Sequence, residues 1–185
     1  VGTQLGDVTG VISYDFGNFQ VNPTAEFTPT ASDLQPETTT IETDEDRLTV
    51  ASYNVLNLDP NDEDGDEDVA DGQFSAIAQQ VVNNLSTPDI IALQEIQDND
   101  GSEITEVSAA NETLETLASA IVDAGGPNYE GIDTPGLVPA FINDDGDLIR
   151  PTGGQPGGNI RAAFLYNPER VDIVENSVEP LTDPE

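Results

Sequence analysis

Two short apolar segments of the chain end on polar side chains whose types suit metal-assisted chemistry. Residues 50–57 and 89–96 place amide and carboxylate groups at their C-terminal ends, namely Asn54, Asn57, Gln94 and Glu95. Active-site residues of α/β proteins commonly follow the ends of sheet strands. Mg²⁺ or Mn²⁺ is held by carboxylates together with phosphate and water, so Glu95 suits a metal ligand, and Asn54 suits a group that supports a phosphate oxygen. Taken alone, each local sequence favours an ordinary acidic strand end or a turn.

A second candidate site lies in the acidic residues 59–68. Asp62, Asp64 and Asp66 alternate around Gly65, as in the first half of a calcium-binding loop. The full EF-hand pattern is not met, because Gly65 stands before the third acid rather than after it. Weak Ca²⁺ binding and ordinary solvated turns are both open for these residues and for two shorter acidic stretches, residues 98–101 and 143–147.

The charge balance limits the partners of the chain. Its 185 residues include 37 acids, four Arg and no Lys, giving a net charge of −33. Such a surface repels polyanions over roughly 10 Å at 0.1 M salt but only over roughly 3 Å at 1 M. A basic stripe of the kind that binds nucleic acid cannot form. The charge indicates adaptation to a salty or calcium-rich exterior, with a disordered acidic chain or a calcium-laden matrix protein as alternatives.

Several chemistries are excluded by the residues that the chain lacks. It has no Cys and no His, so it forms no disulfide, no Cys or His metal site, no Ser-His-Asp triad and no His general base. No apolar run of about 18 residues and no signal peptide is found, so no membrane span is predicted. Because it begins with Val1, we expect a processed or trimmed chain, and secretion is a hypothesis.

Two amphipathic helices are predicted. Residues 74–85 and 114–122 carry apolar side chains at helical spacing, which is typical of helices that cover a sheet. Asp71 is expected to cap the first helix, and Gly125 with Gly126 to end the second. Together with the apolar strands, this order predicts an α/β fold.

Two hairpins and a linker complete the expected organisation. Residues 8–14 pair with 19–22, and residues 159–166 pair with 170–174 across a turn at Asn167. The Thr-, Pro- and acid-rich residues 29–46 are expected to be a linker. The predicted divisions are the end of a small β module, the linker and an α/β domain, at residues 1–28, 29–46 and 47–185.

The two strand ends resemble a known superfamily. Tyr53-Asn54-Val55 is similar to the first motif of the endonuclease/exonuclease/phosphatase superfamily, and Leu93-Gln94-Glu95-Ile96 to the second. Residues 163–171 resemble its later hairpin, and residues 6–28 resemble the end of the OB-like module that precedes the nuclease domain in large secreted bacterial extracellular nucleases. The resemblance implies part of a four-layer αββα, deoxyribonuclease-like sandwich.

The resemblance also implies a function. Asn54 and Glu95 match the catalytic Asn and the metal-binding Glu of a Mg²⁺- or Mn²⁺-dependent hydrolase that cuts nucleic acid or a phosphate ester. Relatives carry a phosphate-contacting Arg where this chain has Asn167. Arg161 shares strand parity with Asn167 and is a substitute, although a salt bridge is the other interpretation for it.

The family's later motifs, including its catalytic His and an Asp-x-Asn, are absent. We therefore expect the N-terminal part of a secreted nuclease, inactive alone and completed by the remainder of the parent chain. The alternative is a non-catalytic calcium-binding module of an extracellular matrix or surface assembly. Either version is expected outside the cell or at its surface, in a high-salt or marine setting.

Overall fold

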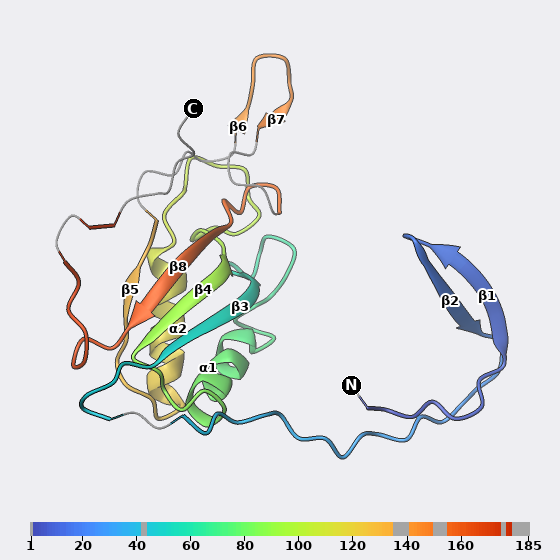
Figure 1. Ribbon diagram of the computed structural model, residues 1–185. Coiled ribbons are helices and arrows are strands. Elements are labelled where there is room, and N and C mark those ends of the chain that lie inside the picture. The colour runs from blue at the N-terminus through green and yellow to red at the C-terminus, as the bar shows by residue number, and fades with distance from the viewer. Residues whose placement is uncertain (1, 42–43, 135–140, 150–154, 175–176, 179–185) are drawn as a thin grey trace. The chain divides into compact units, whose positions relative to one another are not determined.

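The computed structural model describes residues 2–41, 44–134, 141–149, 155–174 and 177–178 (Figure 1). The chain divides into two compact units, Val1–Glu37 and Thr38–Glu185. The division lies within the residues predicted as a linker, and no helix or strand is formed between residues 24 and 41. None of the helices described is long and apolar enough to cross a membrane.

The first unit contains the predicted hairpin. β1 (Gly10–Asp15) pairs antiparallel with β2 (Asn18–Pro23), and Asp15 stands opposite Asn18. The two residues between them, Phe16 and Gly17, both have positive φ angles, 46° and 79°. This is the turn geometry that matches the twist of paired strands, so the short hairpin prediction is confirmed.

The second unit is built on a four-stranded mixed sheet. β3 (Val50–Leu58) runs parallel to β4 (Ile90–Ile96), as expected for two strands joined through a helix. β8 (Arg161–Tyr166) pairs antiparallel with β4 on one side and with β5 (Glu130–Ile132) on the other, giving the order β3-β4-β8-β5. The α/β class predicted from the sequence is confirmed.

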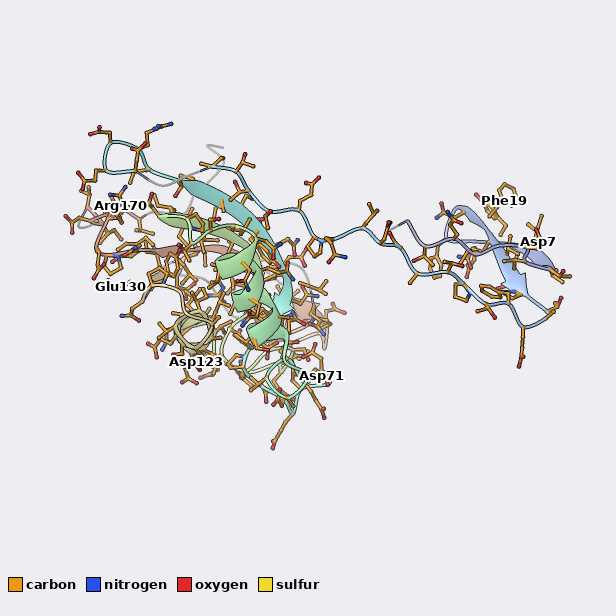
Figure 2. All side chains as sticks on the ribbon, turned by 90° about the horizontal axis from the view of Figure 1, so that it is seen from below. Asp7, Phe19, Asp71, Asp123, Glu130 and Arg170 are labelled. Carbon is orange, nitrogen blue, oxygen red and sulfur yellow. The ribbon has the colours of Figure 1, made fainter. Side chains whose placement is uncertain are left out.

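Two helices cover one face of this sheet, as Figure 1 shows. α1 (Gln73–Asn83) and α2 (Asn111–Asp123) bury their apolar stripes against alternate strand residues. Figure 2 shows the side chains of the described residues as sticks, with α1 against the sheet. On the opposite face Val50 and Phe164 remain 67% and 43% exposed, and no described segment covers them.

Of the two predicted helix ends, the end of α2 is confirmed and the start of α1 is not. Gly125 has a φ of 94°, and the amides of Gly125 and Gly126 donate to the carbonyls of Val122 and Ile121, so the predicted end of α2 is confirmed. The predicted Asp71 cap of α1 is wrong. Gly72 occupies the N-cap position in a left-handed conformation, and no side chain caps the helix.

The predicted return strand at residues 170–174 is also wrong. Both hydrogen-bonding edges of β8 are occupied, by β4 and β5, so no edge is left for a following strand. The turn itself forms, because the Arg170 amide donates to the Asn167 carbonyl at 3.0 Å. A small hairpin not foreseen from the sequence, β6 (Phe141–Ile142) with β7 (Leu148–Ile149), lies between β5 and β8 in the chain.

Candidate functional site

The parallel pairing of β3 and β4 brings the predicted strand-end residues to the same edge of the sheet. Asn54 stands opposite Gln94 in the register, and Glu95 follows directly. Asn54 and Glu95 therefore lie at the same edge of the sheet, because both strands run the same way.

Both strands are bulged at this edge. The register shifts between Asn54 and Leu58 on β3, and between Leu93 and Ile96 in the pairing of β4 with β8. The buried residues on either side of each bulge are three positions apart instead of two, namely Val55 and Leu58 on β3, and Leu93 and Ile96 on β4. Each bulge therefore contains two consecutive residues where a regular strand would have one. Left-handed backbone accompanies the bulges, with φ angles of 60°, 54° and 62° at Leu56, Asn57 and Glu95.

Glu95 is held in an uncommon state. A non-glycine residue in the left-handed region costs about 1–3 kcal/mol, and such strain is concentrated at functional sites. Its side chain is partly exposed, and among the described residues its carboxylate accepts no hydrogen bond and forms no ion pair. The carboxylate is thus free to accept a ligand at the edge where Asn54 also lies.

The side-chain amide oxygens of Asn54 and Gln94, at the same edge as Glu95, already accept hydrogen bonds. Asn54 Oδ1 accepts a hydrogen bond from the Leu56 amide at 2.9 Å, which supports the bulge of β3. The Ser52 hydroxyl donates to Gln94 Oε1 at 3.2 Å, across the two parallel strands. The Asn54 amide nitrogen makes no hydrogen bond within the described residues, so it is available as a donor to an anionic oxygen.

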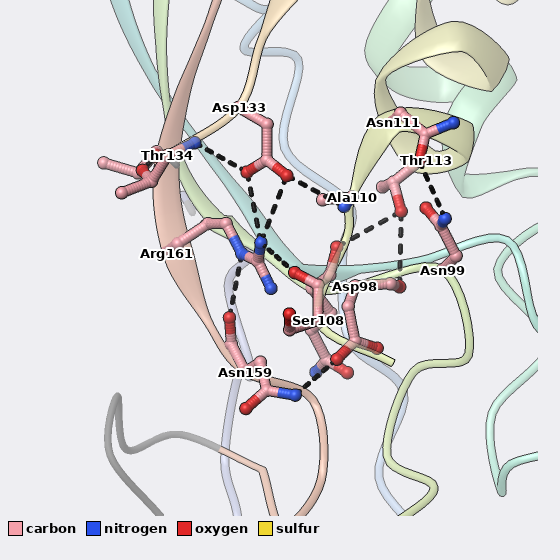
Figure 3. Close-up of polar contacts among 12 residues, drawn as sticks. Asp98, Asn99, Ser108, Ala110, Asn111, Thr113, Asp133, Thr134, Asn159 and Arg161 are labelled. Carbon is pink, nitrogen blue, oxygen red and sulfur yellow. Dashed lines mark hydrogen bonds and ion pairs between the residues drawn. The ribbon is translucent and has the colours of Figure 1, made fainter. Parts of the chain in front are cut away.

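Arg161 is used internally, as Figure 3 shows. Its guanidinium is buried, forms an ion pair with Asp133 at 3.1 Å and donates to the Ser108 and Asn159 carbonyls. The salt-bridge interpretation therefore describes Arg161 in this structure. Its partner Asp133 also accepts from the Ala110 amide at 2.9 Å and was not identified from the sequence.

Asn167 lies at the opposite end of the sheet from Glu95. Its amide donates to the carbonyl of Asp89, the residue before β4, whereas Glu95 lies near the other end of that strand. A strand of seven residues spans about 20 Å. The structure thus separates Asn167 from Asn54 and Glu95, and its Oδ1 accepts a hydrogen bond from the Glu169 amide.

The acidic residues 59–68 do converge, but not as the set expected from the sequence. Carboxylate oxygens of Asp59, Asp64 and Asp66 lie within 4.8 Å of one another. We call these three residues the acidic cluster. Asp62 is used elsewhere, because its Oδ1 accepts hydrogen bonds from the amides of Val69 and Ala70.

Burial and mutual repulsion disturb the ionisation of this region. Burial is the largest cause that raises the pKa of Asp59 to about 7; a hydrogen bond from Asn61 opposes it, and repulsion by the acids on residues 64–68 adds to it. Burial likewise raises the pKa of Asp66 and, to about 6, that of Asp68. These directions follow first from burial, which disfavours the charged form, and then from negative charges held close together.

Another buried acid, Asp98, follows the end of β4. Asp98 is fully buried, accepts a hydrogen bond from Asn159 Nδ2 at 2.6 Å, and its amide donates to the Gly158 carbonyl (Figure 3). Burial raises the pKa of Asp98 to about 7; Asn159 lowers it and Asp100 raises it. The sequence placed Asp59 and Asp98 in acidic stretches, but their burial was not predicted. Their common signal is position, since each follows closely after a buried strand end.

Comparison with known proteins adds no relative. No protein-family model matches the chain, and no match was found among the curated proteins or the solved structures.

Proposed function

We propose that the second unit supplies the metal-binding side of a divalent-metal-dependent phosphodiesterase. The observation that carries this proposal is the state of Glu95: a carboxylate without a partner, on strained backbone, at the edge where two parallel strands end. Strain of this kind persists only where the surrounding structure enforces it. The arrangement suits a group that is positioned for a ligand rather than for stability.

The donor set at this edge fits Mg²⁺ or Mn²⁺. Both ions prefer carboxylate oxygen and retain water and phosphate as further ligands. When bound, such an ion polarises a phosphoryl oxygen and stabilises the leaving oxygen. Glu95 would hold the ion, and the free amide nitrogen of Asn54 would donate to a phosphate oxygen. The chain has no His, so a His base would have to come from outside it.

Metal binding at Glu95 can be measured separately from any other acidic site. We suggest titrating Mn²⁺ by electron paramagnetic resonance into Asp64→Asn protein, in which the acidic cluster is weakened. Glu95→Gln should then lower the Mn²⁺ affinity by about tenfold or more. Glu106→Gln is the matched control, because Glu106 is exposed and makes no hydrogen bond in the described structure. Equal affinities in the two variants would remove Glu95 from the site.

Hydrolysis provides the second test. In the protein that contains this chain, cleavage of DNA or of bis(p-nitrophenyl) phosphate should require the metal. It should fall by about 100-fold or more in Glu95→Gln, because a catalytic metal supplies several kcal/mol of transition-state stabilisation. An unchanged rate would contradict the proposal. The remaining candidate would then be a non-catalytic calcium-binding module, which the acidic cluster favours.

A further inference from the structure

We propose that Asp59, Asp64 and Asp66 form a calcium site that fastens residues 59–68 to the loop following β4. This site is distinct from Glu95 and does not depend on the phosphodiesterase proposal. It would give the calcium-binding alternative a defined set of ligands. The three residues follow β3, and their carboxylate oxygens converge within 4.8 Å.

Unsatisfied buried oxygens point to a missing ligand. Asp59 is 0% exposed and its Oδ2 has no hydrogen-bond partner. One buried oxygen of Asp64 and one of Asp66 are also without a partner. Buried carboxylates are costly unless they are paired or coordinate a metal. Three such oxygens in one place are explained by a cation that all of them share.

No basic side chain of the described structure can supply that positive charge. The chain has four Arg and no Lys. Arg47, Arg161 and Arg170 are in ion pairs with Asp44, Asp133 and Asp89, and the fourth, Arg150, lies outside the described residues. The counter-charge for the acidic cluster is therefore expected from solution.

The loop after β4 is shaped to approach the acidic cluster. Gly101 has a φ of 63°, and a Cβ on it would lie 2.2 Å from Asp64 Oδ2 and 2.5 Å from Asp59 Oδ1. Only glycine permits this approach. The Ser102 amide donates to Asp64 Oδ2 at 2.5 Å and its hydroxyl to the Asp64 carbonyl at 2.9 Å. The second oxygen of each carboxylate is thereby left for a cation.

The donors and the loop suit Ca²⁺. Oxygen ligands lie about 2.3–2.6 Å from Ca²⁺, so two ligands of one ion can be up to about 5 Å apart, and carboxylate oxygens that lie within 4.8 Å of one another meet this limit. Mg²⁺ demands nearly octahedral geometry and retains several waters, whereas Ca²⁺ accepts a flexible shell of carboxylate oxygens. Three carboxylates on an irregular loop therefore favour Ca²⁺.

Calorimetric titration of the metal-free chain with Ca²⁺ tests the site. The titration is done in about 1 M NaCl, where the Debye length is about 3 Å, so that diffuse binding to the acidic surface is suppressed. We expect saturable binding of one ion per chain, and an affinity about tenfold or more lower in Asp64→Asn. Asp123→Asn, at the exposed last residue of α2, is the matched control and should leave the affinity unchanged.

Two further measurements test whether the Asp64→Asn variant is folded and whether the calcium site is independent of Glu95. Metal-free Asp64→Asn should melt at the same or a higher temperature, which shows that it is folded and relieved of repulsion. Glu95→Gln should retain Ca²⁺ binding, which separates this site from the one under Proposed function. Absence of saturable heat, equal loss in Asp123→Asn, loss in Glu95→Gln, or equal affinity for Mg²⁺ would overturn the proposal.

Discussion

The two ends of the central sheet bury carboxylates in opposite ways. At the start of β4, Asp89 accepts hydrogen bonds from the Thr49 amide and hydroxyl at 2.7 and 3.0 Å, and from Arg170 Nε at 2.9 Å. At the far end, the acidic cluster has buried oxygens with no partner. The difference teaches that this chain neutralises a buried acid internally where an Arg can reach it. Where none reaches, at the acidic cluster, we propose that an ion from solution supplies the positive charge.

The largest expected effect comes from breaking the internally neutralised end. Asp89→Asn removes the charge that pairs with Arg170, whose side chain is only 28% exposed. Leaving one partner of a buried pair uncompensated should lower the free energy of unfolding by about 3 kcal/mol. Urea denaturation measures this change, which should be the same with and without Ca²⁺. Asp172→Asn, at an exposed position, should change it by less than about 0.5 kcal/mol.

Acid should remove the same stabilisation. Burial alone would raise the pKa of Asp89, but hydrogen bonds from Thr49 and Arg170 outweigh it and the pKa is lowered. A lowered folded-state pKa adds stability that is complete above the unfolded-state value and is lost as pH falls through the folded-state value. The difference in unfolding free energy between wild type and Asp89→Asn should therefore narrow below about pH 4. The total narrowing is about 1.4 kcal/mol for each unit by which folding lowers the pKa of Asp89. A gap that stays constant down to pH 2 would contradict this assignment.

Glu95 should behave unlike Asp89, because its carboxylate has no partner to lose. Glu95→Ala should change the free energy of unfolding little, whereas Glu95→Gly should be about 1 kcal/mol more stable than Glu95→Ala, since glycine adopts a φ of 62° without strain. Thermal unfolding of the two variants measures the difference. If Glu95→Ala were the more stable, the left-handed conformation would not describe the protein in solution.

Sequence reasoning found the elements whose patterns are local. The helical stripes follow from periodicity, the β1–β2 hairpin from its turn residues, and the α/β class from the strand–helix–strand order along the chain. The bulges were not foreseen, although buried Val55 and Leu58, three residues apart, break the alternation of a regular strand. The return strand after β8 failed because strand pairing is non-local: β5 occupies that edge.

The candidate sites were also predictable to different degrees, because some depend on chain order and others on non-local contacts. Asn54 and Glu95 share an edge because two parallel strands end together, which their order in the chain indicates. Asn167 and Arg161 were grouped by strand parity alone, which does not say at which end of the sheet a residue lies. In the acidic stretch, composition shows many carboxylates, and only the folded path of the loop shows that Asp59 is buried.

The smallest expected effect distinguishes Asp62 from the acidic cluster. Asp62→Asn keeps the Oδ1 that accepts the Val69 and Ala70 amides, and it removes only a charge outside the group of converging oxygens. In 1 M salt, where such a charge is screened, the Asp62→Asn substitution should change the Ca²⁺ affinity by less than about threefold.

Asp66→Asn is the comparison variant, because it removes the charge of a carboxylate in the acidic cluster, and it should weaken Ca²⁺ binding by about tenfold or more. Calorimetric titration of the Asp62→Asn and Asp66→Asn variants with Ca²⁺ measures both affinities. Equal losses would mean that Ca²⁺ responds to the total charge of residues 59–68, and the contrast between the two ends of the sheet would then be one of charge density rather than of built sites.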